Sequence, residues 1–325
     1  MRKGVNPEKN KNEINQKKYH RIIIPVYIPD IGSEYYAGSI DVLERCLNSL
    51  SKTINPKTTV ITVVNNNCGG AATTLIEKFL KAKKLDKHVI HVENRGKVFV
   101  AISEARGSFE EFITICDADV LFFSGWEKAV FEIFENYPQA GVVSPVPSQN
   151  LALYHNSSVF YDKFLNSIQY GKIVPDEDCE LFLQGLGNEA LLRRNNHPYD
   201  WKEKQYYLNG KSPVLLGANH YVATYRKEVL EHQSDFPKNK FKKGYEENFL
   251  DEPADILGYY RLSTVNSFAY HMGNRMDDVS GDFSLKQNAL IENDYFHSIP
   301  KAKSSKIPYS IRKNFFRILR KLKKI

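Results

Sequence analysis

Short apolar runs alternate with amphipathic segments along the first half of the chain. Apolar and β-branched runs bounded by polar residues are typical of buried strands, and apolar residues spaced three and four apart are typical of helices that pack on them. Ser39, at the start of the first amphipathic segment, is the expected N-cap. The pattern predicts strands at 21–28, 60–64, 88–92, 112–116 and 141–144, and helices at 39–51, 71–84, 97–105 and 126–135.

This alternation predicts the α/β fold class, with a doubly wound, mostly parallel sheet flanked by helices. Open sheets of this kind bind their ligands at the carboxyl ends of the strands. No strand is followed by a Gly-x-Gly-x-x-Gly turn, and no Walker-type loop is present. A Rossmann dinucleotide site and a P-loop nucleotide site are therefore not expected.

The pattern loosens after residue 147, where tyrosine, asparagine and leucine become frequent. For residues 150–213 we expect irregular structure and short strands that form a substrate-facing wall, including Trp201. Further on, the pattern predicts a strand at 214–217, a short helix at 224–230, a charged mobile loop at 233–243 and a strand-like run at 267–274 that contains His271.

The strand at 112–116 leads directly into two carboxylates, Asp117 and Asp119. Residues two apart on an extended backbone point the same way, so these carboxylates should lie together and repel each other unless a cation binds between them. Hard oxygen ligands favour Mg²⁺ or Mn²⁺. The same spacing recurs at Asp176 and Asp178, but no strong strand precedes it, and we interpret that copy as a solvated loop.

Charge is concentrated at the ends of the chain. The net charge is +7, yet residues 298–325 hold ten Lys or Arg and no acid, and residues 1–21 hold seven basic and two acidic residues, so residues 22–297 carry −8. An acidic body does not fit a nucleic-acid-binding surface. The four cysteines form no Cys-x-x-Cys pair and no secretion signal is visible, so we expect a cytoplasmic protein with reduced thiols.

The C-terminal segment, residues 310–325, has the pattern of an amphipathic helix rich in basic residues. Such helices lie in the interface of anionic membranes. We therefore predict a protein that is peripheral on the inner face of the cell membrane, with a helix docked on its own domain or on a partner as the alternative. The predicted membrane contacts are Phe315, Phe316, Arg317, Leu319, Arg320 and Lys321.

Several motifs, taken in their order and spacing, resemble the family 2 glycosyltransferases with the GT-A fold. Each motif is common alone, and the resemblance covers roughly residues 20–274. The motifs are Ile22-Ile23-Ile24-Pro25-Val26-Tyr27, Val63-Val64-Asn65-Asn66-Asn67, Glu93-Asn94-Arg95-Gly96-Lys97, Asp117-Ala118-Asp119, Gly125-Trp126, the acidic cluster at 246–255 and Tyr270-His271.

The resemblance implies transfer of one sugar from a nucleotide diphosphate donor to a hydroxyl of a glycan or lipid-linked glycan, in cell-surface polysaccharide or glycolipid assembly. It implies an inverting enzyme. The absence of the Gln-x-x-Arg-Trp motif of processive synthases predicts that the enzyme is non-processive. The resemblance divides the domain into a nucleotide-sugar-binding half (20–150) and an acceptor-binding half (151–297). Composition and charge predict a disordered basic tail before it (1–19) and a basic membrane-associating tail after it (298–325).

The resemblance also assigns roles to residues. Mn²⁺ or Mg²⁺ would be held by Asp119, Asp117 and His271, although His271 can equally be a buried histidine satisfied by hydrogen bonds. Three asparagines stand where many relatives have an aspartate that binds the base. The donor nucleotide would be bound by Pro25, Tyr27, Asn65, Asn66, Asn67, Asn94, Lys97, Asp117 and Ala118.

The general base of such enzymes is usually the aspartate of a Glu-Asp pair, which this chain lacks. It offers Glu246-Glu247 and Asp251-Glu252 instead. We predict that Asp251 and Glu252 carry the catalysis, because Asp255 and the segment 261–264 follow them as in relatives. A positioned base of this kind contributes about 10²- to 10⁴-fold to the rate.

Two other functions are compatible with parts of the pattern. A haloacid-dehalogenase-type phosphohydrolase also has a buried strand before Asp-x-Asp, and there Asp117 would be the nucleophile and Asp119 the acid and base. That motif normally lies on the first strand, whereas here three strand–helix units precede it. A membrane-recruited scaffold that has lost its metal is the non-enzymatic alternative.

Overall fold

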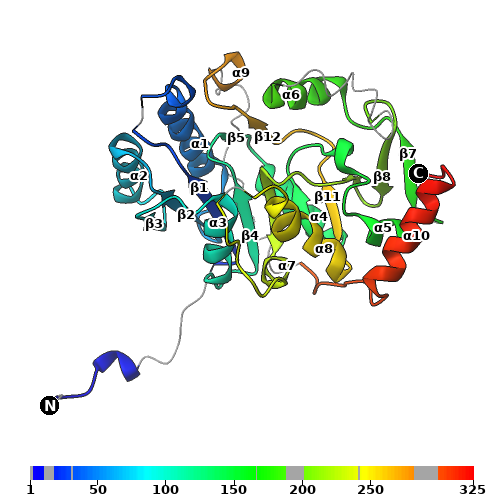
Figure 1. Cartoon of the computed structure of the whole chain (residues 1–325), viewed down its shortest axis with the longest axis horizontal. Coiled ribbons are helices and arrows are strands. Elements are labelled where there is room, and N and C mark those ends of the chain that lie inside the picture. Colours follow the sequence, from blue (N-terminus) through cyan, green and yellow to red (C-terminus); the bar gives the residue numbers. More distant parts are fainter. Residues whose placement is uncertain are drawn as a thin grey trace.

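The structure is a computed structural model that describes residues 3–10, 18–30, 32–165, 167–187, 201–240, 242–281 and 299–325. Its centre is a ten-stranded sheet, beside which lies a second sheet of two strands. Helices lie on both sides of the strands, and the two halves of the chain form the two ends of one elongated body (Figure 1). The predicted α/β class is confirmed.

Strands and helices alternate through the first part of the chain. They are β1 (His20–Val26), α1 (Ser39–Thr53), β2 (Thr59–Asn66), α2 (Gly70–Lys81), β3 (Lys87–His91), α3 (Lys97–Arg106) and β4 (Phe112–Cys116). The four strands lie in the order β3-β2-β1-β4 and are parallel, so their carboxyl ends meet at one edge. The predicted N-cap of α1 is wrong by one residue, because Gly38 occupies the cap and Ser39 is already helical.

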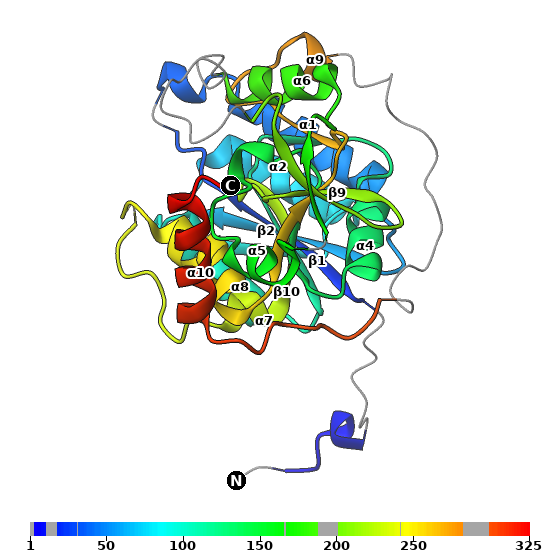
Figure 2. The ribbon, with the colours of Figure 1, turned by 90° about the vertical axis from the view of Figure 1, so that its right-hand side faces the viewer.

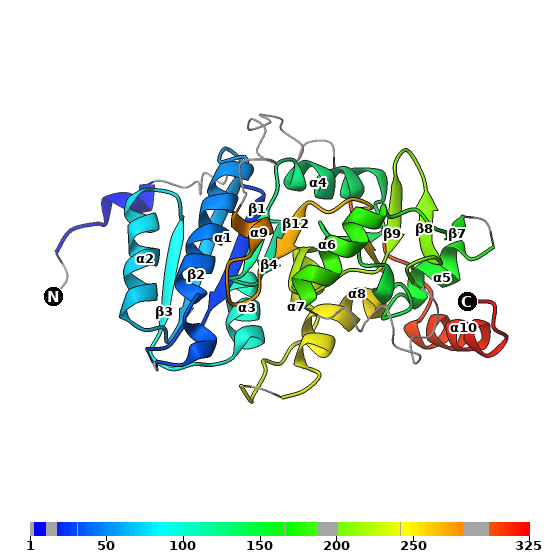
Figure 3. The same cartoon turned by 90° about the horizontal axis from the view of Figure 1, so that it is seen from above.

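The sheet separates two apolar cores. Ile22 and Ile24 pack in the core that contains α1 and α2, and Ile23 packs in the core that contains α3. All three side chains are fully buried. The unbroken apolar run of β1 therefore reflects a strand covered on both faces. Figure 3 shows α1 and α2 beside this half of the sheet.

A strand from late in the chain continues the sheet beyond β4. β10 (Val222–Arg226) lies between β4 and β6 (Ala140–Ser144) and is antiparallel to both. The predicted helix over 224–230 is wrong for its first residues, because Thr224 and Tyr225 pair with both neighbouring strands. The helix α7 spans only Lys227–Glu231.

Beyond β6 the sheet continues through both parallel and antiparallel strand pairs, as far as its edge strand β7. β11 (Tyr260–Ser263) is parallel to β6, and the remaining three strands are antiparallel to their neighbours. Those strands are β9 (Pro213–Leu216), β8 (Gln205–Asn209) and β7 (Ile168–Gly171), so the full order is β3-β2-β1-β4-β10-β6-β11-β9-β8-β7. The sheet is thus parallel in its first half and mixed beyond β4.

The described part of the region 150–213, which leaves out 166 and 188–200, is more regular than predicted. Trp201 is buried beside Phe182 instead of lining an open wall. Besides its strands it contains α5 (Ser157–Lys163) and α6 (Asp176–Leu186). The predicted loop at Asp176–Asp178 is wrong. These acids form the first turn of α6, where negative charge suits the helix dipole, and Asp178 accepts a hydrogen bond from the backbone N–H of Ser267 (2.9 Å).

The remaining elements are short, apart from the helices α4 and α10. They are η1 (Pro7–Asn10), η2 (Glu34–Tyr36), β5 (Val120–Phe122), α4 (Trp126–Asn136), η3 (Gln149–Leu151), η5 (Glu247–Asp251), α8 (Glu252–Leu257), β12 (Ala269–His271), α9 (Asp278–Gly281) and α10 (Tyr309–Lys321). β12 and β5 form the two-stranded sheet, which pairs His271 with Val120. Residues 11–17, within the predicted disordered tail, and 282–298 lie outside the described part of the chain.

The C-terminal helix α10 packs on its own domain, alongside α5 (Figure 2). Phe316 and Leu319 are buried there, and the Phe315 ring contacts Tyr161. These three predicted membrane contacts therefore face protein in this structure, as the docked-helix alternative anticipated. The buried Arg312 donates hydrogen bonds to the Asp255 and Ile256 carbonyls at the end of α8. No described helix has the length and apolar composition that a bilayer crossing requires.

An ion pair ties β1 to the segment before β4. Arg21 donates to both carboxylate oxygens of Glu110, from Nε at 2.8 Å and from Nη2 at 2.7 Å. Burial opposes ionisation of Glu110, but the hydrogen bonds and charge of Arg21 hold its pKa below the ordinary value. The pair therefore stabilises the folded state wherever Glu110 is ionised.

We expect Glu110→Gln to lower the free energy of unfolding by about 2 kcal/mol at neutral pH, because a hydrogen bond between charged groups is lost. The contribution is complete above the ordinary glutamate pKa of about 4.3 and is lost as pH falls through the lowered value in the folded state. Urea unfolding across pH measures it. The control Glu44→Gln removes an exposed pair with Lys78 and should cost less than about 0.5 kcal/mol; equal losses would contradict the assignment.

Candidate active site

A cavity of about 330 Å³ opens at the carboxyl ends of β1, β2 and β4. It is bounded by the ends of these parallel strands, by the loop before α1 and by the turn after β12, so its position is that expected of a ligand site in an open α/β sheet. Seven of the nine residues predicted to bind the nucleotide line it: Pro25, Tyr27, Asn66, Asn94, Lys97, Asp117 and Ala118.

The other two predicted nucleotide ligands, Asn65 and Asn67, do not line the cavity. Asn65 is buried and holds the following turn, because its Oδ1 accepts from the Cys68 N–H (2.7 Å) and its Nδ2 donates to Thr73 (2.9 Å). Asn67 has a positive φ of 69°, which a tight turn requires and asparagine tolerates. Both residues therefore shape the strand end that presents Asn66.

Aromatic residues that the sequence analysis missed form one wall of the cavity. Tyr35 and Tyr36 lie in the loop before α1, and the Tyr36 ring stands edge-on to Tyr27 with centroids 6.2 Å apart. Gly273 and Asn274 also line the cavity, from the turn after β12. The two adjacent tyrosines between the first strand and the first helix could have predicted this wall, since a surface that binds a ring at the carboxyl edge of a sheet needs aromatic side chains.

Asparagine side chains fix the polar wall. Asn66 donates from Nδ2 to Asn94 Oδ1 (2.9 Å), and its own Oδ1 accepts from the Arg95 N–H (2.9 Å). Asn94 Oδ1 also accepts from the N–H of Gly96, whose φ of +85° lets the chain turn into α3. This turn places Lys97, the first residue of α3, beside the carboxylates.

Asp117 has a basic partner that spacing alone did not predict. Lys97 Nζ forms an ion pair with Asp117 Oδ1. Burial disfavours the ammonium, but the charges of Asp117, Glu246 and Asp119 raise the pKa of Lys97 above its ordinary value. Lys97 therefore stays charged and neutralises one of the two carboxylates.

Asp119 is left with an uncompensated charge. Burial is the main cause that raises its pKa to about 6, the charge of Asp117 raises it further, and His271 and Lys97 oppose the rise. Its Oδ1 is buried and has no hydrogen-bond partner among the described residues. Its Oδ2 lies 3.4 Å from His271 Nε2.

The orientation of His271 points to the same site. Its Nδ1 lies 2.8 Å from the Gly185 carbonyl oxygen, which can only accept, so Nδ1 carries a proton. Whenever the ring is neutral, its free lone pair is on Nε2, which lies opposite Asp119 Oδ2. A cation between them would satisfy both.

The residues present fit one divalent metal ion held jointly with a ligand. The described part of the chain contains no group of three or more His, Cys, Asp or Glu side chains close enough to hold a metal alone. Asp119 and His271 supply one oxygen and one nitrogen, and Asp117 is occupied by Lys97. Mg²⁺ and Mn²⁺ are commonly bound by one or two carboxylates, with substrate phosphates and water completing the shell.

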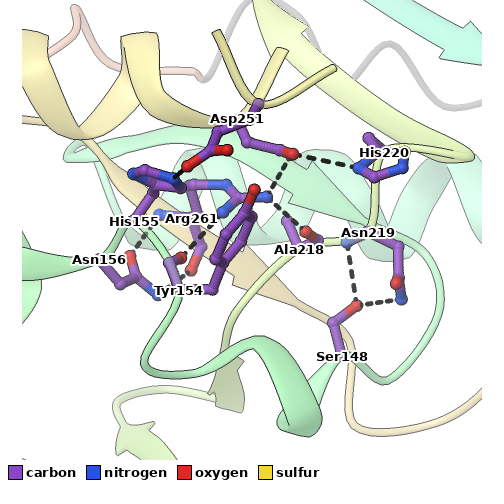
Figure 4. A network of polar contacts seen from close by, with 10 residues as sticks. Ser148, Tyr154, His155, Asn156, Ala218, Asn219, His220, Asp251 and Arg261 are labelled. Atoms are coloured by element: carbon purple, nitrogen blue, oxygen red, sulfur yellow. Dashed lines mark hydrogen bonds and ion pairs between the residues drawn. The ribbon is translucent and has the colours of Figure 1, made fainter. Parts of the chain in front are cut away.

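The predicted catalytic pair, Asp251 and Glu252, is split between two environments. Asp251 is 1 % exposed and accepts from Arg261 Nη2 (2.6 Å) and His220 Nδ1 (3.1 Å), as Figure 4 shows. Glu252 accepts from the Tyr309 hydroxyl (3.0 Å) and pairs with Lys313, so it faces α10. The assignment of Glu252 to the catalytic machinery is corrected: it helps to dock the C-terminal helix.

The comparisons with known proteins assign the chain to a family. A model of glycosyl transferase family 2 matches residues 22–196, which is more than half of the chain. The chain therefore belongs to glycosyl transferase family 2, and the resemblance to that family is confirmed. The findings do not support the haloacid-dehalogenase alternative. Comparison with curated protein sequences gives no match.

Solved structures give remote likenesses. The chain is similar to the mannosyltransferase PcManGT of Pyrobaculum calidifontis in complex with GDP-Man and Mn²⁺ (14 % identity, 77 % of this chain, 58 % of that one, TM-score 0.43). It is also similar to S. aureus TarS 1-349, with 14 % identity over 86 % of this chain and 68 % of that one and a TM-score of 0.46. For the UDP-GlcNAc complex of TarS 1-349 the identity is 15 % over 81 % of this chain and 60 % of that one, with a TM-score of 0.44. The chain spans about three fifths of the mannosyltransferase.

We expect Asp119→Asn to raise the melting temperature in metal-free buffer above pH 6, because it removes a charge that burial and Asp117 disfavour. The gain should be on the order of 1 kcal/mol. A raised pKa means that the folded state binds a proton more tightly than the unfolded state, so wild-type stability falls as pH rises from about 4 to about 6.

Thermal unfolding at pH 4 and pH 8 tests this, since the difference between variant and wild type should appear only at the higher pH. The control Glu132→Gln, which removes an exposed pair with Lys128, should show no such dependence. A destabilised Asp119→Asn variant at pH 8 would mean that the carboxylate has a structural partner.

Proposed function

We propose that this member of glycosyl transferase family 2 transfers a single sugar from a nucleotide diphosphate donor to a hydroxyl acceptor, with Mn²⁺ or Mg²⁺ as cofactor. The observation that carries the proposal is the unpartnered Asp119 oxygen opposite the free lone pair of His271, at the mouth of a cavity where parallel strands end. A cation bound there would satisfy both groups.

The cavity offers different chemistry to each part of such a donor. Tyr27, Tyr35 and Tyr36 provide ring faces and edges for a base, and Asn66 and Asn94 provide amide groups for base or ribose edges. Lys97 provides a fixed positive charge for the diphosphate. The donor would therefore lie from the tyrosines toward Asp119.

The residues around Asp119 would bind and orient the leaving group. A bound divalent ion supplies Lewis-acid stabilisation of charge on the diphosphate. Asp119 and His271 would hold that ion, and Lys97 would balance charge from the side of Asp117. We propose an inverting, non-processive reaction, as expected from the family resemblance.

The exposed side of α10 supports the proposal that the acceptor is reached at an anionic membrane. Although Phe316 and Leu319 face the domain, Ile311, Ile318 and Leu322 are 50, 53 and 62 % exposed and recur at helical spacing. Arg317, Arg320 and Lys321 are exposed beside them. A peripheral enzyme of this kind would meet lipid-linked or cell-surface glycan acceptors.

We expect a nucleotide diphosphate sugar to raise the melting temperature in a metal-dependent way. A donor present at 100 times its Kd adds about 2.7 kcal/mol of stability. A panel that includes GDP-mannose and UDP-GlcNAc, each with and without Mn²⁺, tests this by thermal shift. In Asp119→Asn the metal-dependent part should disappear. If no donor shifts wild type, the proposed function fails.

We expect the double variant Ile318→Ser and Leu322→Ser to reduce binding to phosphatidylglycerol vesicles at least about tenfold, because the exposed apolar surface of α10 is lost. Liposome sedimentation measures it, with phosphatidylcholine vesicles to isolate the electrostatic part. The matched control Leu165→Ser removes another exposed leucine (85 %) outside α10. Unchanged binding of the double variant would exclude α10 as the membrane contact.

A further inference from the structure

The contact between His220 and Asp251 defines which ring nitrogen of His220 faces the carboxylate. Asp251 is the buried partner. Burial works to raise its pKa, but the charge of Arg261 and the hydrogen bond and charge of His220 outweigh burial and hold the pKa below the ordinary value. Asp251 is therefore a carboxylate that accepts a hydrogen bond from His220 Nδ1. Nδ1 therefore carries a proton, and whenever the ring is neutral its lone pair is on Nε2.

Asp251 is held in place from several sides. The Arg261 guanidinium donates to Asp251 (2.6 Å), and to the carbonyls of Ala218 (2.6 Å) and Tyr154 (2.9 Å) (Figure 4). Arg261 is 1 % exposed, so this ion pair lies in a region of low dielectric where it is strong. A carboxylate fixed in this way can orient His220 firmly.

His220 lies at the level of the Asp-x-Asp motif. β10 is antiparallel to β4 with Val222 opposite Cys116, and the Asp117 N–H donates to the Tyr221 carbonyl (2.8 Å). His220 is the residue next to Tyr221 in the chain, just beyond this hydrogen bond. The Tyr221 ring contacts His271, with centroids 5.2 Å apart, so the residue next to His220 touches the proposed metal site.

The outer edge of His220 is open. Its side chain is 42 % exposed, and among the residues that the structure describes none forms a hydrogen bond with Nε2. Asp251, in contrast, is too buried to contact an acceptor. The site thus presents a proton acceptor, Nε2, backed by a buried carboxylate, one residue from the Tyr221 carbonyl that binds the Asp117 N–H.

We propose that His220 is the general base of the transfer and that Asp251 is its positioning residue, an inference that rests on the proposed function. As the acceptor oxygen forms its bond to the anomeric carbon, its proton passes to Nε2. The bond between that carbon and the diphosphate oxygen breaks, and the electron pair leaves with the diphosphate. The imidazolium, stabilised by Asp251, then releases the proton to solvent.

The test compares turnover and donor binding in the full chain. The probes are the nucleotide sugars that shift wild-type melting, with water as acceptor and release of nucleoside diphosphate as the readout. His220→Gln should lower kcat by about 10²- to 10⁴-fold and leave the Mn²⁺-dependent thermal shift and the donor KM unchanged. The matched control His232→Gln, at an exposed histidine after α7, should behave as wild type.

Chemical rescue separates a base from a structural residue. Azide is a nucleophile that carries no proton to remove, so it should restore turnover in His220→Ala and yield the glycosyl azide, while giving wild type little gain. Asp251→Asn should show a smaller loss of kcat with the same rescue. A merely structural role would give variants that azide does not restore.

The outcomes distinguish the two levels of the proposal. If wild type neither binds nor turns over any donor, the proposed function fails and this inference fails with it. If wild type is active and His220→Gln retains its rate within about threefold, only this inference is overturned. Glu246, whose charge acts on Lys97, is the competing candidate. If Glu246→Gln abolishes turnover and azide restores it, while His220→Gln does neither, this inference is likewise overturned.

Discussion

Two carboxylates and one ammonium meet at the end of β4, and their unequal pairing is the constraint on which the candidate site depends. Lys97 neutralises Asp117, whereas Asp119 is partly buried beside it, with one buried and unpartnered oxygen and a pKa raised to about 6. A fold does not gain stability from such a charge. The arrangement is explained by what it can bind, because a cation would remove both the repulsion and the unmet hydrogen-bonding capacity. The rest of the sheet holds these three groups in place.

The sequence predicts the first half of the fold well, because each strand and helix there has its own periodicity and connects to the next by a short turn. β10 was missed for a physical reason: Thr224 and Tyr225 are strand residues only because β4 and β6, which lie far away in the chain, flank them. The carboxylates of the site were visible as a motif. The pairing of Lys97 with Asp117, and of His220 with Asp251, depends on tertiary contacts that no local pattern encodes.

In the acidic cluster and in the C-terminal helix, residues that belong to one sequence pattern face two different surroundings. Glu252 follows Asp251 in the chain, but the two point apart, one toward Tyr309 and the other toward His220. On α10, the apolar residues divide in the same way between the domain and solvent. Sequence periodicity identified the helix and its apolar residues, but which of them face protein depends on α5 and α8, whose positions the pattern does not specify.

The late position of β10 in the chain has a consequence for biogenesis. During synthesis, the four parallel strands can assemble once residue 116 has emerged, yet β4 then has a free edge until residues 222–226 arrive to cover it. An unpaired strand edge of β-branched residues is a template for association with other chains. The nascent polypeptide therefore passes through a long window of synthesis in which a chaperone or rapid translation would protect it from aggregation.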